Sequence, residues 1–292
     1  METSKKSIYF IINPISGTAK KHRLPDLFKQ LIDPSLFEWE IKYTDHPHHA
    51  TEIAQDAVDR DIDYVIAVGG DGTVNETAKA LIGSTSKLGI IPLGSGNGLA
   101  RHLGIPLKPE NALKSMLAGN TVKIDTCAVN GQPFFCTSGV GFDALVSHYF
   151  AQNKGRGLLN YAKTAIQQYF NYKPATYQIT VDGYEYTEQA FVVTLANAAQ
   201  YGNNAYISPE ADISDGLLDL CVVNKFPKLF GVVLIFRSFT GSIHKSKYMK
   251  IIRGKHITIR NKGNYAHLDG DPAELAPSLH YSIQQQSLEV LV

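Results

Sequence analysis

Two glycine-rich stretches decide the fold: Gly69-Gly70-Asp71-Gly72-Thr73 and, further along, Pro92-Leu93-Gly94-Ser95-Gly96-Asn97-Gly98-Leu99-Ala100-Arg101. Each stretch follows an apolar run typical of a strand and precedes a run typical of a helix. Glycines at such a turn let backbone N–H groups approach phosphate oxygens, and the helix N-terminus adds a favourable dipole. The two stretches together predict a nucleotide phosphate site.

The lone acid of the first loop, Asp71, does not fit simple anion binding. It would repel phosphate unless it holds a metal ion, orients a hydroxyl or takes a proton, so it indicates chemistry as well as binding. The second loop matches neither common nucleotide fingerprint. Leu99 stands at the last glycine of the dinucleotide pattern, and the lysine-containing end of a P-loop is missing.

From Ser7 to about Val122, apolar strands alternate with amphipathic helices, which predicts an α/β domain with a parallel sheet over residues 1–123. The expected strands are 8–12, 39–43, 64–68 and 88–92, and the expected helices cover Leu24 to Ile32, 49–60 and 74–82. Both glycine loops then fall at the carboxyl ends of strands. Open α/β sheets bind their ligands at that edge.

After about Ile124 the pattern changes to strands separated by hairpin signals, Val129-Asn130-Gly131-Gln132 and Val181-Asp182-Gly183-Tyr184. Asn-Gly and Asp-Gly suit type I′ turns. We expect a mostly-β sandwich over residues 124–292, with one helical insert at 158–170 and last residues that could return to the first domain. Its further strands are expected at 191–195, 217–223, 256–260 and 287–292.

Composition limits the function classes. At 292 residues, 44% of them hydrophobic, the chain is long enough for two cores, and a formal charge of +1 predicts no nucleic-acid partner. The three cysteines are too few for a disulfide framework or a zinc site, and the first residues lack a secretory apolar region. The apolar run 230–236 is too short to span a bilayer. We expect a cytoplasmic protein without a membrane anchor.

Other polar segments are candidates for chemistry. The first strand ends in Asn13-Pro14-Ile15-Ser16-Gly17, close in sequence to Lys20, Lys21 and Arg23. This segment could contact a nucleotide, or it could be an ordinary turn with a solvated basic face. Asp212, Asp215 and the carbonyl of Leu217 could form an oxygen cage for Mg²⁺, with a solvated turn as the alternative.

Two more acids, Asp269 and Asp271, flank Gly270 in a tight turn. Crowded carboxylates raise one another's proton affinity, which suits a general base or a shared metal, whereas an Asx turn is the plainer interpretation. A metal cluster is conceivable at His46, His48 and His49, but a solvent-exposed helix start is the favoured interpretation.

In this order along nearly the whole chain, these motifs resemble the diacylglycerol kinase catalytic family, which includes bacterial soluble lipid kinases and sphingosine kinases. The resemblance implies an N-terminal nucleotide-binding α/β domain, a C-terminal β-sandwich and ATP in the cleft between them. It implies ATP contacts and Mg²⁺ ligands at the candidate positions. The implied nucleotide-binding residues are Asn13, Thr44, Gly69, Gly70, Asp71, Gly72, Thr73, Asn75, Glu76, Gly94, Ser95 and Asn97, and the implied magnesium ligands are Asp212, Asp215 and Leu217.

The terminal turn aligns with an Asp-Gly-Glu turn whose acids take the base role, which implies Asp269 as the base, Asp271 as its partner or alternative, and Asp71 as a third candidate. Asp271 departs from the pattern by one methylene, a displacement of about 1.5 Å. Asn97-Gly98 departs from the Asn-Asp of many bacterial glycerolipid kinases and looks closer to sphingosine kinases.

The sequence therefore predicts an ATP-dependent lipid kinase of lipid metabolism, acting on diacylglycerol, a related glycerolipid of phospholipid biosynthesis or a sphingoid base. Because the acceptor is a lipid, we expect transient docking at the membrane surface through apolar residues that could equally fill cores. These are Leu158, Leu159, Tyr169, Phe170, Tyr172 and Phe230. The alternatives are an NAD kinase, which leaves Asn13-Pro14 unexplained, and a non-catalytic nucleotide- or lipid-binding module. A homodimer and a monomer both fit the sequence.

Overall fold

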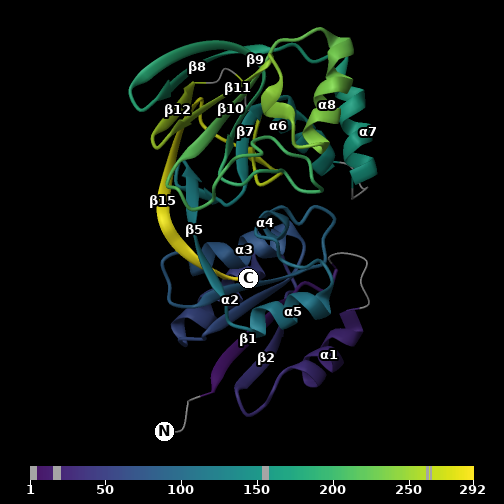
Figure 1. The fold of residues 1–292 in the computed structure, drawn as a ribbon, viewed down its shortest axis with the longest axis vertical. Coiled ribbons are helices and arrows are strands. Elements are labelled where there is room, and N and C mark those ends of the chain that lie inside the picture. Colours follow the sequence, from purple (N-terminus) through teal and green to yellow (C-terminus); the bar gives the residue numbers. More distant parts are fainter. Residues whose placement is uncertain (1–4, 16–20, 153–157, 261–262, 264) are drawn as a thin grey trace. The chain divides into compact units, whose positions relative to one another are not determined.

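The computed structural model describes residues 5–15, 21–152, 158–260, 263 and 265–292. The chain divides into two compact units: unit 1 comprises Met1–Ile124 with Gln286–Val292, and unit 2 comprises residues 125–285. Strand β15 (Ser278–Leu291) runs from unit 2 into unit 1, where Val290 pairs in parallel with Leu88. The C-terminal segment thereby adds a strand beside β4 (Lys87–Pro92) to the sheet of the N-terminal unit (Figure 1).

Unit 1 is built on a parallel sheet in the order β15-β4-β3-β1-β2. Its first four strands are β1 (Lys6–Ile12), β2 (Phe37–Tyr43), β3 (Tyr64–Gly69) and β4 (Lys87–Pro92). Every residue of β3 is buried, as expected for a strand covered on both faces. On β1, Phe10 stacks on Phe28 with ring centroids 4.0 Å apart. The predicted α/β class of this half is confirmed.

The helices of unit 1 follow the strands as the alternation predicted. They are α1 (Leu24–Leu31), α2 (His49–Asp59), α3 (Asp71–Leu81), α4 (Gly98–His102) and α5 (Pro109–Leu117), with a short 3₁₀ turn η1 (Lys21–Arg23) before the first. One boundary differs in a way that matters for the site. The helix expected from Val74 begins at Asp71, because Gly70 takes an extended conformation and serves as the N-cap. Asp71, Gly72 and Thr73 are therefore its first turn.

Unit 2 is a mostly antiparallel β structure, which confirms the predicted sandwich class. β9 is central, because it pairs with β7, β8 and β10. The strands are β5 (Thr121–Val129), β6 (Gln132–Phe134), β7 (Thr137–Gly141), β8 (Ala175–Val181), β9 (Tyr184–Ala196), β10 (Leu218–Asn224), β11 (Met249–Gly254), β12 (Ile257–Arg260), β13 (Tyr265–Leu268) and β14 (Asp271–Glu274). A core of buried side chains that includes Phe134, Tyr177 and Tyr281 fills the unit.

Both predicted hairpins form. Val129 pairs with Gln132 across Asn130 and Gly131, whose φ angles are 49° and 79°. Val181 pairs with Tyr184 across Asp182 and Gly183, whose φ angles are 47° and 90°. Positive φ at both central positions is the requirement of the type I′ turn that the Asn-Gly and Asp-Gly pairs indicated.

The expectation of a single helical insert in the second half is wrong. Three helices, α6 (Phe142–Gln152), α7 (Leu158–Tyr169) and α8 (Gly231–Phe239), group on one side of unit 2 in Figure 1. The sequence hides α8 because apolar side chains lie on its outer face as well as its inner one: Leu234 is buried, whereas Val232, Ile235 and Phe236 are exposed. Among the described residues, no helix is long and apolar enough to cross a bilayer.

Candidate functional site

The carboxyl ends of the parallel strands of unit 1 bring the predicted nucleotide-binding segments to one edge of the sheet. Backbone hydrogen bonds tie these ends together: Thr44 N–H donates to Ile12 O at 3.0 Å, and Leu93 N–H donates to Gly69 O at 2.7 Å. Asn13 N–H donates to the carbonyl of β3 residue Val68 at 3.3 Å. Segments from four strands thus meet where open α/β sheets bind ligands.

The carboxylate of Asp71 joins the two glycine loops. Its Oδ2 accepts a hydrogen bond from Asn97 N–H at 2.9 Å, and its Oδ1 accepts one from Gly98 N–H at 2.7 Å. Both donors lie at the N-terminus of α4, where an anion satisfies N–H groups that the helix leaves unpaired. Asp71 therefore organises the site, a role that its position in the sequence did not indicate.

Close packing between the loops explains most of their glycines. A Cβ built on Gly94 would lie 2.6 Å from Gly70 Cα, and one on Gly96 would lie 2.6 Å from Asp71 Oδ2. A Cβ on Gly69 would lie 2.5 Å from Thr73 Oγ1. Gly94 and Gly96 are required by the contact of the two loops with each other, and Gly69 by the packing of Thr73 within the first loop.

Gly72 is the exception. It is exposed in the first turn of α3, and a Cβ built on it would meet nothing within 4 Å. The N-cap of this helix is Gly70, so no side chain caps the first N–H groups from that position. An eleven-residue helix thus begins at the ligand edge of the sheet with small residues at its N-terminus, an arrangement that favours an anion.

The second loop is held by its own side chains. Asn97 lies in the left-handed region with φ 51°, its Oδ1 accepts from Gly94 N–H at 3.1 Å, and its Nδ2 donates to Gly94 O at 2.9 Å. Arg101 Nε donates to Gly96 O at 3.0 Å. This preformed loop leaves Ser95 exposed, as a ligand-contacting residue must be.

The remaining predicted nucleotide contacts are less open. Thr44, Thr73 and Asn75 are buried, and Glu76 accepts a hydrogen bond from His48 N–H at 3.2 Å. Asn13 Oδ1 accepts from Ile15 N–H at 3.0 Å. The nearby ammonium of Lys21, whose pKa burial lowers, donates to Asn13 O at 2.6 Å. Ser16, Gly17 and Lys20 lie outside the described residues.

In unit 2, the predicted magnesium ligands lie in a loop stabilised by its own turns. Asp212 Oδ1 accepts from Ser214 N–H at 2.9 Å, and Asp215 Oδ1 accepts from Leu217 N–H at 2.9 Å. Burial raises the pKa of Asp215, and the negative charge of Asp212 adds to the rise. Carboxylates and a backbone carbonyl are oxygen ligands of the kind that Mg²⁺ prefers, so the donor chemistry of these residues suits the ion.

Sequence reasoning missed the residue that anchors this loop. Asp125 is fully buried in β5, and its Oδ2 accepts a hydrogen bond from Gly216 N–H at 2.6 Å. Its own N–H donates to Ile213 O at 2.7 Å. A charged residue between Ile124 and residues 126–129 is the signal that could have revealed it, because Asp is almost never fully buried unless it is paired.

The carboxylate of Asp269 is surrounded by backbone donors. Oδ2 accepts from Phe135 N–H at 2.8 Å, and Oδ1 accepts from Cys136 N–H at 2.7 Å and Thr137 N–H at 3.0 Å. Burial raises the pKa of this carboxyl, and the three hydrogen bonds to its ionised form oppose that rise. Asp271, two residues on in β14, is exposed. The structure thus gives different surroundings to Asp269, which the sequence analysis took as the base, and to Asp271, which it took as the partner or alternative.

Comparison with known proteins identifies the family. The profile of the diacylglycerol kinase catalytic domain matches residues 7–129, and the profile of the YegS C-terminal NAD kinase beta sandwich-like domain matches residues 137–292. A diacylglycerol kinase of Mycobacterium tuberculosis is 32% identical over 246 residues, 78% of this chain and 78% of that protein. The chain belongs to the diacylglycerol kinase family. One from Bacillus subtilis is 32% identical over 232 residues, 75% of this chain and 74% of that protein.

The fold of this family member agrees with solved structures. The crystal structure of a diacylglycerol kinase from Bacillus anthracis str. Sterne matches it with a TM-score of 0.74 at 22% identity, covering 98% of this chain and 96% of that chain. The chain spans only 59% of the length of a relative from Synechocystis sp. and 62% of one from Klebsiella pneumoniae. The resemblance drawn from the motifs is confirmed.

A buried polar network beside the Asp269 turn was also missed from the sequence. Asp143 Oδ2 lies 3.1 Å from His267 Nε2 and accepts a hydrogen bond from Thr194 Oγ1 at 2.6 Å and one from Tyr201 O–H at 3.1 Å. Burial and the Asp143 charge raise the pKa of Tyr201 well above its usual value. These groups lie far apart in the sequence, so no local spacing could join them. The network fixes β13, which leads into Asp269.

Proposed function

We propose that this chain is an ATP-dependent lipid kinase that transfers the γ-phosphoryl group of ATP to the hydroxyl of a lipid, either a diacylglycerol or related glycerolipid or a sphingoid base. The family supports the class of reaction and of acceptor. The observation that carries the nucleotide half is the N-terminus of α3 with Gly72 open, joined by Asp71 to the second glycine loop. The phosphates of ATP would bind there.

Asp271 is the better candidate for the general base. Both oxygens of Asp269 already accept backbone hydrogen bonds, so its carboxylate is suited to holding the turn. Asp271 is exposed and follows it directly in β14. In this proposal Asp269 positions the turn and Asp271 takes the proton of the acceptor hydroxyl. The proposal requires both units to act on one ATP molecule.

Asp212, Asp215 and the carbonyl of Leu217 would hold Mg²⁺. When bound, the ion neutralises phosphate charge, which is most of what phosphoryl transfer needs from a protein besides positioning. Without it, burial raises the pKa of the Asp215 carboxyl, and the negative charge of Asp212 adds to the rise. The protein's own part is to keep these acids together through Asp125, which fixes the loop at Gly216.

The outer face of α8 would dock on the lipid surface. Apolar side chains at helical spacing are exposed there, with a further one just before the helix. This apolar face comprises Leu229, Val232, Ile235, Phe236 and Phe239, exposed by 93%, 74%, 59%, 67% and 46%. Lys228 and Arg237 add positive charge, which suits an anionic bilayer. Docking would be peripheral and reversible.

The exposure of the side chains favours a docking set that differs from the one the sequence suggested. Phe170 and Leu159 are exposed, as the docking hypothesis requires. The other aromatic residues of that set pack against rings of the protein instead. Tyr169 and Tyr172 pack against Phe142, and the ring centroid of Phe230 lies 5.0 Å from that of Tyr248. The side chain of Leu158 is outside the described ones. At the end of α7, Tyr169 O–H donates to Lys228 O at 2.5 Å, and Lys228 lies in the short turn just before α8.

The test is an acceptor panel. The protein is incubated with γ-labelled ATP and Mg²⁺ and, separately, with diacylglycerol vesicles, sphingosine vesicles and NAD, and the labelled products are identified. We expect label in one lipid product and none in NADP. Label in NADP alone would establish the NAD kinase alternative, and tight ATP binding without any labelled product would establish the non-catalytic module.

A further inference from the structure

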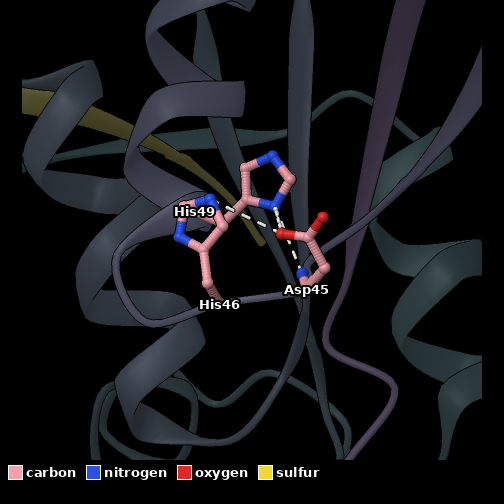
Figure 2. Close-up of side chains that lie close together, drawn as sticks. All are labelled: Asp45, His46 and His49. Atoms are coloured by element: carbon pink, nitrogen blue, oxygen red, sulfur yellow. Dashed lines mark hydrogen bonds and ion pairs between the residues drawn. The ribbon is translucent and has the colours of Figure 1, made fainter.

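The connection between β2 and α2 brings three potential metal ligands together outside the proposed nucleotide contacts. Figure 2 shows Asp45, His46 and His49 converging at the start of α2. One carboxylate oxygen and one ring nitrogen from each histidine all lie within 4.8 Å of one another. His48 is not part of the group, because its ring faces Glu76 at 3.9 Å and its side chain is 83% exposed. Of the three histidines singled out in the sequence, the structure selects two.

The tautomer of His46 leaves its other nitrogen facing two acids. Its Nδ1 lies 2.9 Å from Pro47 O, so this nitrogen carries the proton and donates it. The second nitrogen, Nε2, lies 3.5 Å from Asp45 Oδ1 and 3.8 Å from Glu52 Oε2. A lone pair would thus face two carboxylates. A positive species, a second proton or a metal ion, would favour this arrangement, and the N–H bond to a backbone carbonyl is how metal-bound histidines are oriented in proteins.

His49 presents a similar conflict. Its Nδ1 lies 2.6 Å from Asp45 Oδ1 and 3.2 Å from Asp45 N–H. The first contact needs a proton on the nitrogen and the second needs a lone pair, so one nitrogen cannot satisfy both. A metal ion bound to both Nδ1 and Oδ1 would take the place of the proton between them, and the longer contact would be lost.

The distances suit a small ion after modest adjustment. A tetrahedral site with bonds of about 2.0–2.1 Å places its ligand atoms about 3.3 Å apart. Asp45 Oδ1 and His46 Nε2 are 3.5 Å apart, and the 2.6 Å pair of Asp45 and His49 must open. The side chains can move, because His46 is 49% and Asp45 75% exposed. The rings of His46 and His49 are stacked with centroids 4.4 Å apart, and one nitrogen of each faces the Asp45 carboxylate (Figure 2).

We infer that Asp45, His46 and His49, with Glu52 as a fourth ligand, bind one divalent cation of the Zn²⁺ class. Two imidazole nitrogens with carboxylates select Zn²⁺, Co²⁺ or Ni²⁺ over Mg²⁺ and Ca²⁺, which prefer oxygen ligands. A surface hollow of about 240 Å³ that includes His49 and Glu52 among its lining residues leaves room for a bound water. The site is distinct from the Mg²⁺ site proposed in unit 2 and does not depend on the kinase proposal.

The test uses the full chain without a polyhistidine tag, stripped with chelator and titrated with Co²⁺ while its visible absorption is recorded. We expect one equivalent to bind with saturable absorption, and Zn²⁺ to displace it. His46→Asn and His49→Asn should each weaken Co²⁺ binding at least tenfold. The matched control, His48→Asn, should bind Co²⁺ like the wild type, since this residue lies between the two ligands in the chain but faces Glu76. Circular dichroism checks that each variant is folded.

A second measurement needs no variant. In the wild-type protein, NMR signals of the His46 and His49 rings should shift on adding one equivalent of Zn²⁺, while that of His48 stays in place. The inference is overturned if no saturable binding occurs with one equivalent, if the His46 and His49 variants bind Co²⁺ as tightly as the wild type, or if Zn²⁺ shifts other histidines instead.

Discussion

Asp71 in unit 1 and Asp269 in unit 2 make similar hydrogen bonds, but the groups that stay exposed beside them differ. Each carboxylate accepts backbone hydrogen bonds from a distant segment: two for Asp71, from Asn97 and Gly98, and three for Asp269, from residues 135–137. Asp71 begins helix α3, and Gly72 in the first turn of that helix has open space beside it. Asp269 follows β13 in the turn before β14, where a second acid, Asp271, is exposed.

The comparison teaches that an acid inside a ligand loop need not be the reacting group. In both places an aspartate holds the loop through N–H groups that would otherwise lack partners, an arrangement that favours the ionised carboxylate. In the proposed function, an anion binds beside the exposed Gly72 in unit 1, and the exposed carboxylate of Asp271 takes a proton in unit 2.

The largest effect is expected for Asp269→Asn. The new amide would direct its own N–H groups at backbone donors, so hydrogen bonds to a charged acceptor, each contributing about 1.5–3 kcal/mol, are lost. We expect the free energy of unfolding to fall by about 3 kcal/mol or more, together with lipid kinase activity, as measured by urea unfolding and product formation. Unchanged stability would show that the turn does not depend on this carboxylate.

A pair of glycine variants separates packing from ligand binding. Gly94→Ala places a Cβ against the backbone of Gly70 and should destabilise the protein by about 1–3 kcal/mol. Gly72→Ala should leave stability unchanged or raise it by up to about 1 kcal/mol, because alanine favours a helix. If phosphate approaches at Gly72, this variant should weaken ATP binding at least tenfold by calorimetry. ATP affinity equal to the wild type would remove α3 from the proposed phosphate site.

The apolar face of α8 can be tested with Ile235→Ser and Phe236→Ser combined. Each inserted side chain of this size contributes about 1.5 kcal/mol or more, so the double variant should bind anionic vesicles at least tenfold more weakly. Leu36→Ser is the matched control, since Leu36 is 54% exposed in unit 1. Equal vesicle binding by the double variant and the wild type would exclude α8 as the docking surface.

The smallest effect concerns the predicted magnesium loop. Burial and the charge of Asp212 raise the pKa of Asp215 in the folded protein, so the ionised carboxylate destabilises the fold. This penalty is absent below the unfolded-state pKa of the carboxyl, and it grows as the pH rises through the folded-state pKa. In Mg²⁺-free buffer at pH 7, Asp215→Asn should therefore raise the free energy of unfolding by about 0.5 kcal/mol. The effect is small because solvent screens the charges. The gain should vanish near pH 3, and Mg²⁺ should stabilise the wild type only.

The sequence predicted the alternating half well because strand and helix periods are local. β1 to β4 and their helices follow from hydrophobic spacing, and both type I′ hairpins follow from Asn-Gly and Asp-Gly. α6 and α8 were missed, α8 because its exposed Val232, Ile235 and Phe236 obscure the amphipathic period.

The site was predicted as a set of segments but not as a set of contacts. Parallel strand ends placed Asn13, Thr44 and the glycine loops at one edge. The bond of Asp71 to residues 97 and 98, and that of Asp125 to Gly216, join groups 26 to 91 positions apart and depend on tertiary packing. No spacing rule contains them.

The most direct test of the account compares wild type with Asp271→Asn in single-turnover transfer from labelled ATP to the lipid that the acceptor panel identifies. We predict that the variant folds with unchanged stability, binds ATP within about threefold of the wild type, and forms labelled lipid about 10²-fold more slowly or worse, as expected for loss of a general base. A variant that retains more than about a tenth of the wild-type rate would contradict the assignment of proton transfer to Asp271 and of loop support to Asp269.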